Sequence, residues 1–296
     1  MKVFQRKLGY KFRTKLRTLI LFSIFIPNIT LASPPDPIRF GILSIAQPSR
    51  IYSEWTPFVN YLEKKLNRPI SIIIPKGFGN MQQAIANKEL DFFYVNSYVF
   101  YRMKQEGKAL ALAQMKNING QIVSQSELFV RSDSNINSIY ELKGKTIGFV
   151  SPMGAGGYLA PRAYLNINGV QAPGEVKMIF TKNLSTSLHH VLLGKLDVAT
   201  MCGVNFELMS LKIQTGDLRI IGKSDPYPEN VMAARSDIDP KIMQKLTDIF
   251  IDMPNHSDGQ KSLSTLRDMK IQAFVPYDEE SEKLTTTLVK QANLTP

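Results

Sequence analysis

Small and polar residues follow several predicted strands, and their side chains and backbone amides could hold a small solute. In open α/β sheets, ligands bind beyond the carboxyl ends of the strands, where helix N-termini present free N–H groups. Four junctions of this kind occur in the sequence, at residues 44–49, 96–97, 151–157 and 202–205. These junctions are therefore the candidate binding segments.

The junction at residues 151–157 is the most informative of the four. Gly154, Gly156 and Gly157 would let the backbone approach a ligand closely, and a helix predicted from Tyr158 would present its N-terminus there. An anion at such a terminus gains about 0.3–1 kcal/mol when exposed. The segment is not a P-loop, because it lacks Gly-Lys-Ser/Thr. It is not a dinucleotide fingerprint either, because Leu159 occupies the last glycine position. A flexible glycine turn without a ligand is the alternative interpretation.

Aromatic residues gather at the same junctions and together suggest a cleft around a small organic group, although each alone could belong to the core. They are Tyr52, Trp55, Phe78, Tyr94, Tyr98 and Tyr158.

The sequence shows no catalytic constellation. His189 and His190 are adjacent on a predicted helix and point about 100° apart, which disfavours a shared metal ion. No Gly-x-Ser-x-Gly elbow is present, and Ser97, Cys202 and His189 lack an evident base partner. We therefore predict a protein without catalytic residues, metal or cofactor; an enzyme built on the same fold is the alternative.

Alternating strands and helices position these junctions and predict an α/β architecture with a largely parallel sheet. Strands are expected at residues 38–45, 70–74, 92–95, 109–115, 145–150, 176–180, 198–201 and 218–222. Helices are expected at 52–66, 81–88, 98–105, 158–166, 187–193 and 206–211, an extended run at 121–131, a break at 226–228 and a mostly helical tail at 240–292. Residues 88–97 resemble residues 194–203, which suggests two equivalent halves of a hinged clamp.

The net charge of +11 is concentrated at the N-terminus. Seven of the 36 Lys and Arg residues lie within the first 17 positions, and no acidic residue accompanies them; the other 29 face 25 Asp and Glu, a net charge of +4. A nearly neutral body disfavours nucleic-acid binding. One cysteine excludes an intrachain disulfide.

The N-terminus has the pattern of an export signal: a basic start, an apolar run at residues 18–26 and small residues up to Ala32. The apolar run is too short to span a bilayer. We expect cleavage near Ala32 and a periplasmic protein. An uncleaved membrane anchor is the alternative.

From about residue 38 to residue 275 the chain resembles the phosphate/phosphonate-type substrate-binding proteins of ABC transporters. The resemblance rests on Trp55-Thr-Pro-Phe-Val-Asn-Tyr-Leu-Glu63, Leu90-Asp-Phe-Phe-Tyr-Val-Asn-Ser-Tyr98, Leu142-Lys-Gly-Lys-Thr-Ile-Gly-Phe149, Gly157-Tyr-Leu-Ala-Pro-Arg-Ala-Tyr-Leu165 and Gly194-Lys-Leu-Asp197.

This resemblance implies a two-lobed type II periplasmic-binding-protein fold, with two α/β sandwiches joined by a two-crossing hinge. We expect a signal peptide over residues 1–32, lobe 1 over 33–128 plus 232–296, and lobe 2 over 129–231. The crossings are expected near 127–131 and 226–233, and the C-terminal helices are expected to return to the first lobe.

Relatives usually carry a Ser-Thr-Ser-Gly-like stretch whose hydroxyls hold phosphonate oxygens, and a histidine after the following strand. The matching positions here are Gly154, Ala155 and Gly156 before Gly157, and residues 183–185 replace the histidine region. Backbone N–H groups and the Ser97 hydroxyl are expected to compensate.

The sequence thus predicts an exported protein that traps a small, anionic or polar ligand between two lobes and delivers it to an ABC transporter permease. A receptor for a sensor kinase is the alternative; we expect a monomer that binds no nucleic acid. The predicted ligand-binding residues are Gln47, Phe78, Asn96, Ser97, Tyr98, Gly154, Ala155, Gly156, Gly157, Tyr158, Asn183, Ser185 and Gly203.

Overall fold

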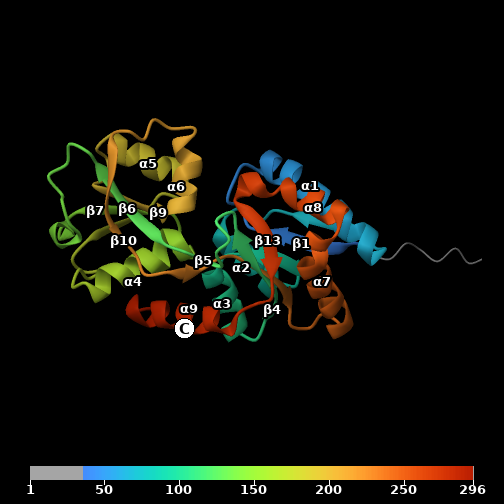
Figure 1. Cartoon of the computed structure of the whole chain (residues 1–296). Helices are drawn as coiled ribbons and strands as arrows, with labels where there is room; N and C mark the ends of the chain where they lie inside the picture. The colour runs from blue at the N-terminus through green and yellow to red at the C-terminus, as the bar shows by residue number, and fades with distance from the viewer. Residues whose placement is uncertain (1–35, 296) are drawn as a thin grey trace, which may run out of the picture. The chain divides into compact units, whose positions relative to one another are not determined.

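The computed structural model describes residues 36–295, so the predicted leader lies outside the described residues. The described residues form a six-stranded sheet, a five-stranded sheet and a two-stranded ribbon. Figure 1 shows the chain folded into two bodies of strands and helices. The six-stranded sheet has the order β13-β4-β12-β3-β1-β2 and contains β1 (Ile38–Ile42), β2 (Ile70–Ile73), β3 (Phe92–Val95), β4 (Ala109–Asn117), β12 (Val231–Arg235) and β13 (Ile271–Val275). The five-stranded sheet has the order β10-β6-β9-β7-β8 and contains β6 (Ser126–Arg131), β7 (Thr146–Phe149), β8 (Lys177–Phe180), β9 (Val198–Cys202) and β10 (Leu218–Lys223). The ribbon pairs β5 (Val123–Ser124) with β11 (Tyr227–Pro228).

Both large sheets are mixed, which corrects the expectation of a largely parallel sheet. Strand β1 runs parallel to β2 and β3, and β7 runs parallel to β8 and β9. The remaining pairs are antiparallel, including those of β12 and β13. The chain passes from β10 of the five-stranded sheet to β12 of the six-stranded sheet through the segment predicted as the second crossing, residues 226–233. The tail at residues 240–292 is mostly helical, as predicted, apart from β13.

The first sandwich consists of the six-stranded sheet and helices on both of its faces. One face carries α1 (Pro48–Leu66), α7 (Pro240–Asp252) and α8 (Ser257–Ser264), and the other carries α2 (Phe78–Ala86) and α3 (Ser97–Gln105). Successive side chains of a strand point to opposite faces, and in β3 Phe92 and Tyr94 face α1, whereas Phe93 and Val95 face α2 and α3.

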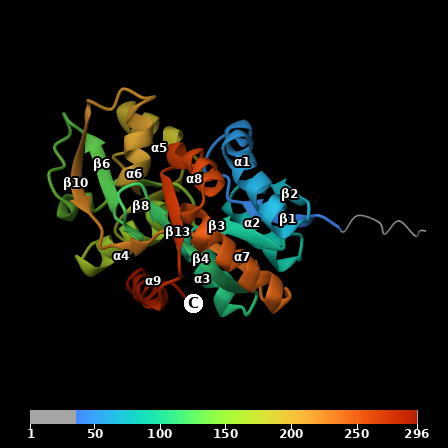
Figure 2. The ribbon, with the colours of Figure 1, turned by 45° about the vertical axis from the view of Figure 1, so that its right-hand side comes forward.

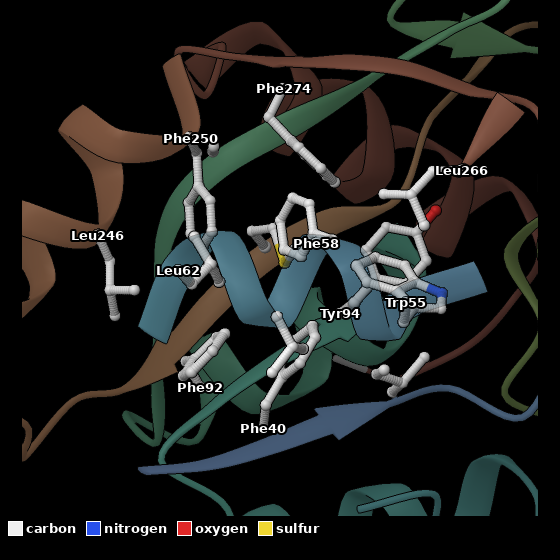
Figure 3. Packing of buried hydrophobic residues seen from close by; sticks show 14 of the residues in the cluster. Phe40, Trp55, Phe58, Leu62, Phe92, Tyr94, Leu246, Phe250, Leu266 and Phe274 are labelled. Carbon is white, nitrogen blue, oxygen red and sulfur yellow. The ribbon is translucent and has the colours of Figure 1, made fainter. Parts of the chain in front are cut away.

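An aromatic cluster fills the core beneath α1 (Figure 3). The Phe40 ring stacks on Phe92 with 4.3 Å between centroids, and Trp55 lies 5.4 Å from Phe40 and 4.9 Å from Tyr94. Trp55 and Tyr94 are almost fully buried. They therefore belong to the core, which corrects the expectation that they line a cleft.

The second sandwich is built in the same way around the five-stranded sheet. Helix α4 (Ala160–Ile167) covers one face, and α5 (Leu184–Leu192) and α6 (Gly203–Ser210) cover the other. A single π-helical turn, η2 (Ala155–Leu159), precedes α4. Short 3₁₀ turns are η1 (Ile139–Leu142), η3 (Met253–Asn255) and η4 (Arg267–Met269).

Helix α9 (Glu279–Gln291) contacts α3 of the first sandwich and α4 of the second (Figure 2). Lys104 of α3 forms an ion pair with Glu282, and Asn166 Nδ2 of α4 donates to the Gln291 carbonyl at 3.1 Å. Helices α7 and α8 pack on the first sheet, as expected of the C-terminal helices, whereas α9 contacts both sandwiches. The described residues 36–295 belong to one compact unit, and the lobe boundaries after residues 128 and 231 stay a prediction.

Candidate ligand-binding site

Every predicted binding residue lies at the carboxyl end of a parallel strand or at the start of the helix that follows. In the first sandwich these junctions precede α1, α2 and α3, and in the second they precede η2, α5 and α6. At such ends the first N–H groups of each helix lack intrahelical acceptors. What each junction can bind depends on which of its donors are already occupied.

Asn96 joins the junctions of the two sandwiches. Its Oδ1 accepts hydrogen bonds from the N–H groups of Tyr98 and Val99, both at 3.0 Å, and thereby caps α3. Its Nδ2 donates to the Met153 carbonyl at 3.1 Å. The β3–α3 junction therefore contacts the loop that precedes η2.

The neighbouring Ser97 hydroxyl is already engaged. Its Oγ donates to the Pro228 carbonyl on β11 at 2.8 Å, so its hydrogen is not available to an anion in this conformation. Ser97 and Tyr98 are both buried. The expected compensation by Ser97 stays a prediction, and it would require the hydroxyl to leave Pro228.

The π-helical turn η2 presents consecutive free backbone donors. Its closing hydrogen bond runs from the Ala160 N–H to the Ala155 carbonyl, and no side chain caps the turn at Gly154. The N–H groups of Ala155, Gly156 and Gly157 precede this bond and have no acceptor within the turn. Consecutive N–H groups without acceptors can bind an anion.

Two glycines of η2 are also required by packing. A Cβ on Gly156 would lie 2.1 Å from the Tyr227 hydroxyl oxygen, and a Cβ on Gly157 would lie 3.0 Å from Val150 Cβ. Tyr227 lies on β11 and Val150 follows β7. The glycines therefore let η2 pack against the ribbon, a role that the glycine spacing does not reveal.

The α1 and α2 junctions are adjacent and open. The Gly77 N–H donates to the Ser44 hydroxyl oxygen at 2.9 Å, which ties the segment after β2 to the segment after β1. Neither Gln47 nor Gly77 caps its helix through a side chain. Gln47 is exposed, and Phe78 is half-buried against the core between the six-stranded sheet and α2.

The α5 and α6 junctions are less suited to an anion. Asn183 Oδ1 accepts from the Ser185 N–H at 2.8 Å and the Thr186 N–H at 3.3 Å, so these donors are occupied. At α6, a Cβ on Gly203 would lie 3.3 Å from both carboxylate oxygens of Glu127. The Glu127 carboxylate, which also pairs with Lys223 at 2.7 Å, already occupies this helix start.

A buried polar cluster beside the ribbon was not predicted from the sequence. The Glu229 carboxylate accepts from Asn117 Nδ2 at 2.9 Å and from the Ser124 hydroxyl. Burial raises the pKa of Glu229, and the hydrogen bonds from Ser124 and Asn117 only partly oppose this. The sequence signal available was the polar Glu229 next to Pro228. Its partners Asn117 and Ser124 lie about a hundred positions earlier, so the sequence did not indicate the pairing.

The candidate chemical groups are placed unfavourably for catalysis. Burial raises the pKa of the Cys202 thiol, which keeps it protonated and weakly nucleophilic. Exposed His189 directs its Nδ1 to the Ser185 carbonyl at 2.8 Å. Within residues 36–295, no three metal-binding side chains converge on a common point.

A surface depression lies away from these junctions. Its volume is about 590 Å³, and none of the predicted binding residues lines it. Its lining comes from Arg131, Ser132, Asp133, His189, Leu192, Lys212, Ile213, Gln214 and Asp217.

Helices of residues 36–295 are all too short or too polar to cross a membrane.

Two α/β sandwiches connected through a short ribbon form the type II periplasmic-binding fold, and the candidate binding junctions lie at their strand ends. Residues 40–281 match the family model described as "ABC transporter, phosphonate, periplasmic substrate-binding protein", and the chain belongs to this family. The predicted family, fold and solute-binding function are thereby confirmed. The family is one of substrate-binding proteins and not of enzymes.

Three similar proteins illustrate the range of the family. The phosphonates-binding periplasmic protein of Escherichia coli is 23% identical over 249 residues, covering 80% of this chain and 74% of its own. The tetrathionate sensor histidine kinase TtrS of Salmonella typhimurium is 24% identical over 198 residues, covering 64% of this chain and 33% of its own. The structure of PhnD1 from Prochlorococcus marinus with methylphosphonate is 16% identical in sequence and has a TM-score of 0.74. The match covers 87% of this chain and 98% of the PhnD1 chain.

Proposed function

We propose that this protein binds a small oxyanion of the phosphonate or phosphate class between its two sandwiches and delivers it to the permease of an ABC transporter. The main support is the hydrogen bond from Asn96 Nδ2 to the Met153 carbonyl. It joins the β3–α3 junction of the first sandwich to the loop before η2, beside the free N–H groups of that turn. The methylphosphonate complex of PhnD1 supports this ligand class.

In this proposal the backbone replaces the hydroxyls of the Ser-Thr-Ser-Gly-like stretch. Ala155, Gly156 and Gly157 supply N–H groups from the second sandwich, and the start of α2 at Phe78 supplies them from the first. Asn96 orients the two sides, and Tyr158 supports η2 from the core, because it is buried and Arg162 holds its hydroxyl. Lobe 1 over residues 33–128 plus 232–296 closes on lobe 2 over 129–231.

The proposed location follows from the leader. We propose that export removes residues 1–32 and leaves a periplasmic, monomeric protein. The mass of the protein purified from the periplasm tests this cleavage, because a chain beginning at Ser33 lacks the whole leader, whereas an uncleaved anchor retains Met1 and its mass.

A sensor kinase is the second candidate partner, because a sensor histidine kinase matches 64% of this chain. Co-purification from membranes distinguishes the two proposals. Permease subunits recovered with the ligand-loaded protein support transport, and recovery of a histidine kinase supports sensing.

Thermal unfolding tests the ligand class. The periplasmic form is heated with methylphosphonate, inorganic phosphate, methanesulfonate or uncharged glycerol. A ligand present at 100 times its Kd adds about 2.7 kcal/mol to the free energy of unfolding. We expect the phosphorus oxyanions to raise Tm, and equal Tm values with and without all three oxyanions would contradict the proposal.

A further inference from the structure

Arg162 is a buried cation one turn after η2. Its side chain is at the start of α4, and only 7% of the residue is exposed. Its guanidinium donates to the Tyr158 hydroxyl of η2 and to the Asn293 carbonyl beyond α9, the latter at 3.4 Å. Its Nε atom is buried and has no hydrogen-bond partner.

No carboxylate compensates this charge among the ion pairs that residues 36–295 form. The guanidinium lies 5.5 Å from the centroid of the Tyr158 ring, and Tyr158 shares a buried cluster with Tyr98. The C-terminal end of α9 contributes only a partial negative charge. A buried cation with such neutral partners keeps a positive potential around it.

The position of Arg162 links this charge to the candidate site. Tyr158 belongs to the turn whose preceding N–H groups are free, and Arg162 holds the Tyr158 hydroxyl from the next helical turn. On the other side, Tyr98 follows Asn96, whose amide reaches the Met153 carbonyl. Arg162 therefore lies directly behind η2, beside the buried tyrosines that the two halves of the proposed site share.

We infer that Arg162 is a positioning residue that gives this site its preference for anions. It holds Tyr158 and the turn η2 in place, and its charge, which no carboxylate neutralises, attracts the bound oxyanion without touching it. The inference rests on the proposed function, and it predicts that the contribution of Arg162 grows with the charge of the ligand.

The test compares Arg162→Met, Arg162→Gln and Arg162→Lys with wild type, using calorimetric Kd values for methylphosphonate and methanesulfonate at a pH where the phosphonate is dianionic. Arg162→Met and Arg162→Gln are expected to weaken methylphosphonate binding by about tenfold or more, and methanesulfonate binding less. Arg162→Lys should recover most of the methylphosphonate affinity, because it keeps the charge.

Asn166→Ala is the matched control, because Asn166 also attaches α4 to the end of α9 but carries no charge. Equal weakening of both ligands, or equal weakening in Asn166→Ala, would show a merely structural role and overturn the inference. If Arg162→Met does not fold, Arg162→Gln and Arg162→Lys decide the question. Wild-type protein that binds neither ligand would instead refute the proposed function, and the inference with it.

Discussion

At Gly156 the absence of a side chain serves packing as well as ligand access. The Tyr227 ring of β11 occupies the space of a Cβ, with its hydroxyl oxygen at 2.1 Å and Cζ at 2.6 Å. The Gly156 carbonyl also accepts a hydrogen bond from the Ser126 hydroxyl, which lies at the start of β6. One residue therefore sets the distance between the candidate binding turn and the connecting ribbon.

We predict that Gly156→Ala lowers the free energy of unfolding by about 1–3 kcal/mol, because the added methyl group must displace a buried tyrosine. Urea unfolding measures the loss. Gly79→Ala in α2 is the control, since no heavy atom lies within 4 Å of its Cβ position; it should be neutral or stabilise by about 0.5–1 kcal/mol. Unchanged stability in Gly156→Ala would mean that Tyr227 moves at no cost.

At the scale of elements, the ribbon β5–β11 is held by the Glu229 carboxyl. Asn117 at the end of β4 and Ser124 on β5 both donate to it, so one side chain connects the ribbon to the six-stranded sheet. Tyr94, Cys202 and Tyr227 face this carboxyl, and burial raises the pKa of each. These three groups are thus neutral near pH 7, and none of them supplies a positive charge to an ionised Glu229.

We predict that the stability of this protein falls as pH rises from the usual glutamate pKa through the raised pKa of native Glu229. The native state holds this proton more tightly than the unfolded state does, so its contribution is complete at low pH and is lost on ionisation. The slope reaches about 1.4 kcal/mol per pH unit.

Urea unfolding at several pH values measures this slope in wild type and in Glu229→Gln. The variant should lack the slope, because the glutamine oxygen accepts both hydrogen bonds without ionising. Glu279→Gln, which alters an exposed carboxyl at the start of α9, should retain it. Identical pH profiles for wild type and Glu229→Gln would contradict the prediction.

At the scale of the whole molecule, α9 couples the two sandwiches. Its side chains Leu288 and Val289 are buried in one cluster with Tyr98 of α3 and Ala163 of α4. The loss of either sandwich would therefore expose apolar surface on α9, at about 25 cal/mol per Å². Coupled burial of this kind favours a single cooperative unfolding transition.

Trp55, the only tryptophan of the chain, provides the measurement because it is buried in the first sandwich. We predict that its fluorescence and the far-ultraviolet circular dichroism, which reports both sandwiches, change at the same urea concentration. A circular-dichroism change that precedes the fluorescence change would mean that the second sandwich unfolds alone. Ligand binding should leave Trp55 emission nearly unchanged, since this residue lies in the core.

Local sequence patterns were sufficient to predict many of the helices, strands and strand-to-helix junctions of this protein. The spacing of apolar residues within single segments predicted the helices containing Trp55 and Tyr98, the strand at residues 92–95 and the junctions that follow the strands, because those features depend on near neighbours. Family motifs predicted the fold and the class of function for the same reason.

Contacts between distant segments were decided only by the tertiary structure. The pairing that makes residues 271–275 a strand, the Tyr227 ring against Gly156, and the buried charge of Arg162 each depend on a partner far along the chain. The spacing of apolar residues does not identify such partners, since the sequence of an apolar run or a lone arginine is the same whatever packs against it. The folded chain assigns the partner, and with it the role of the residue.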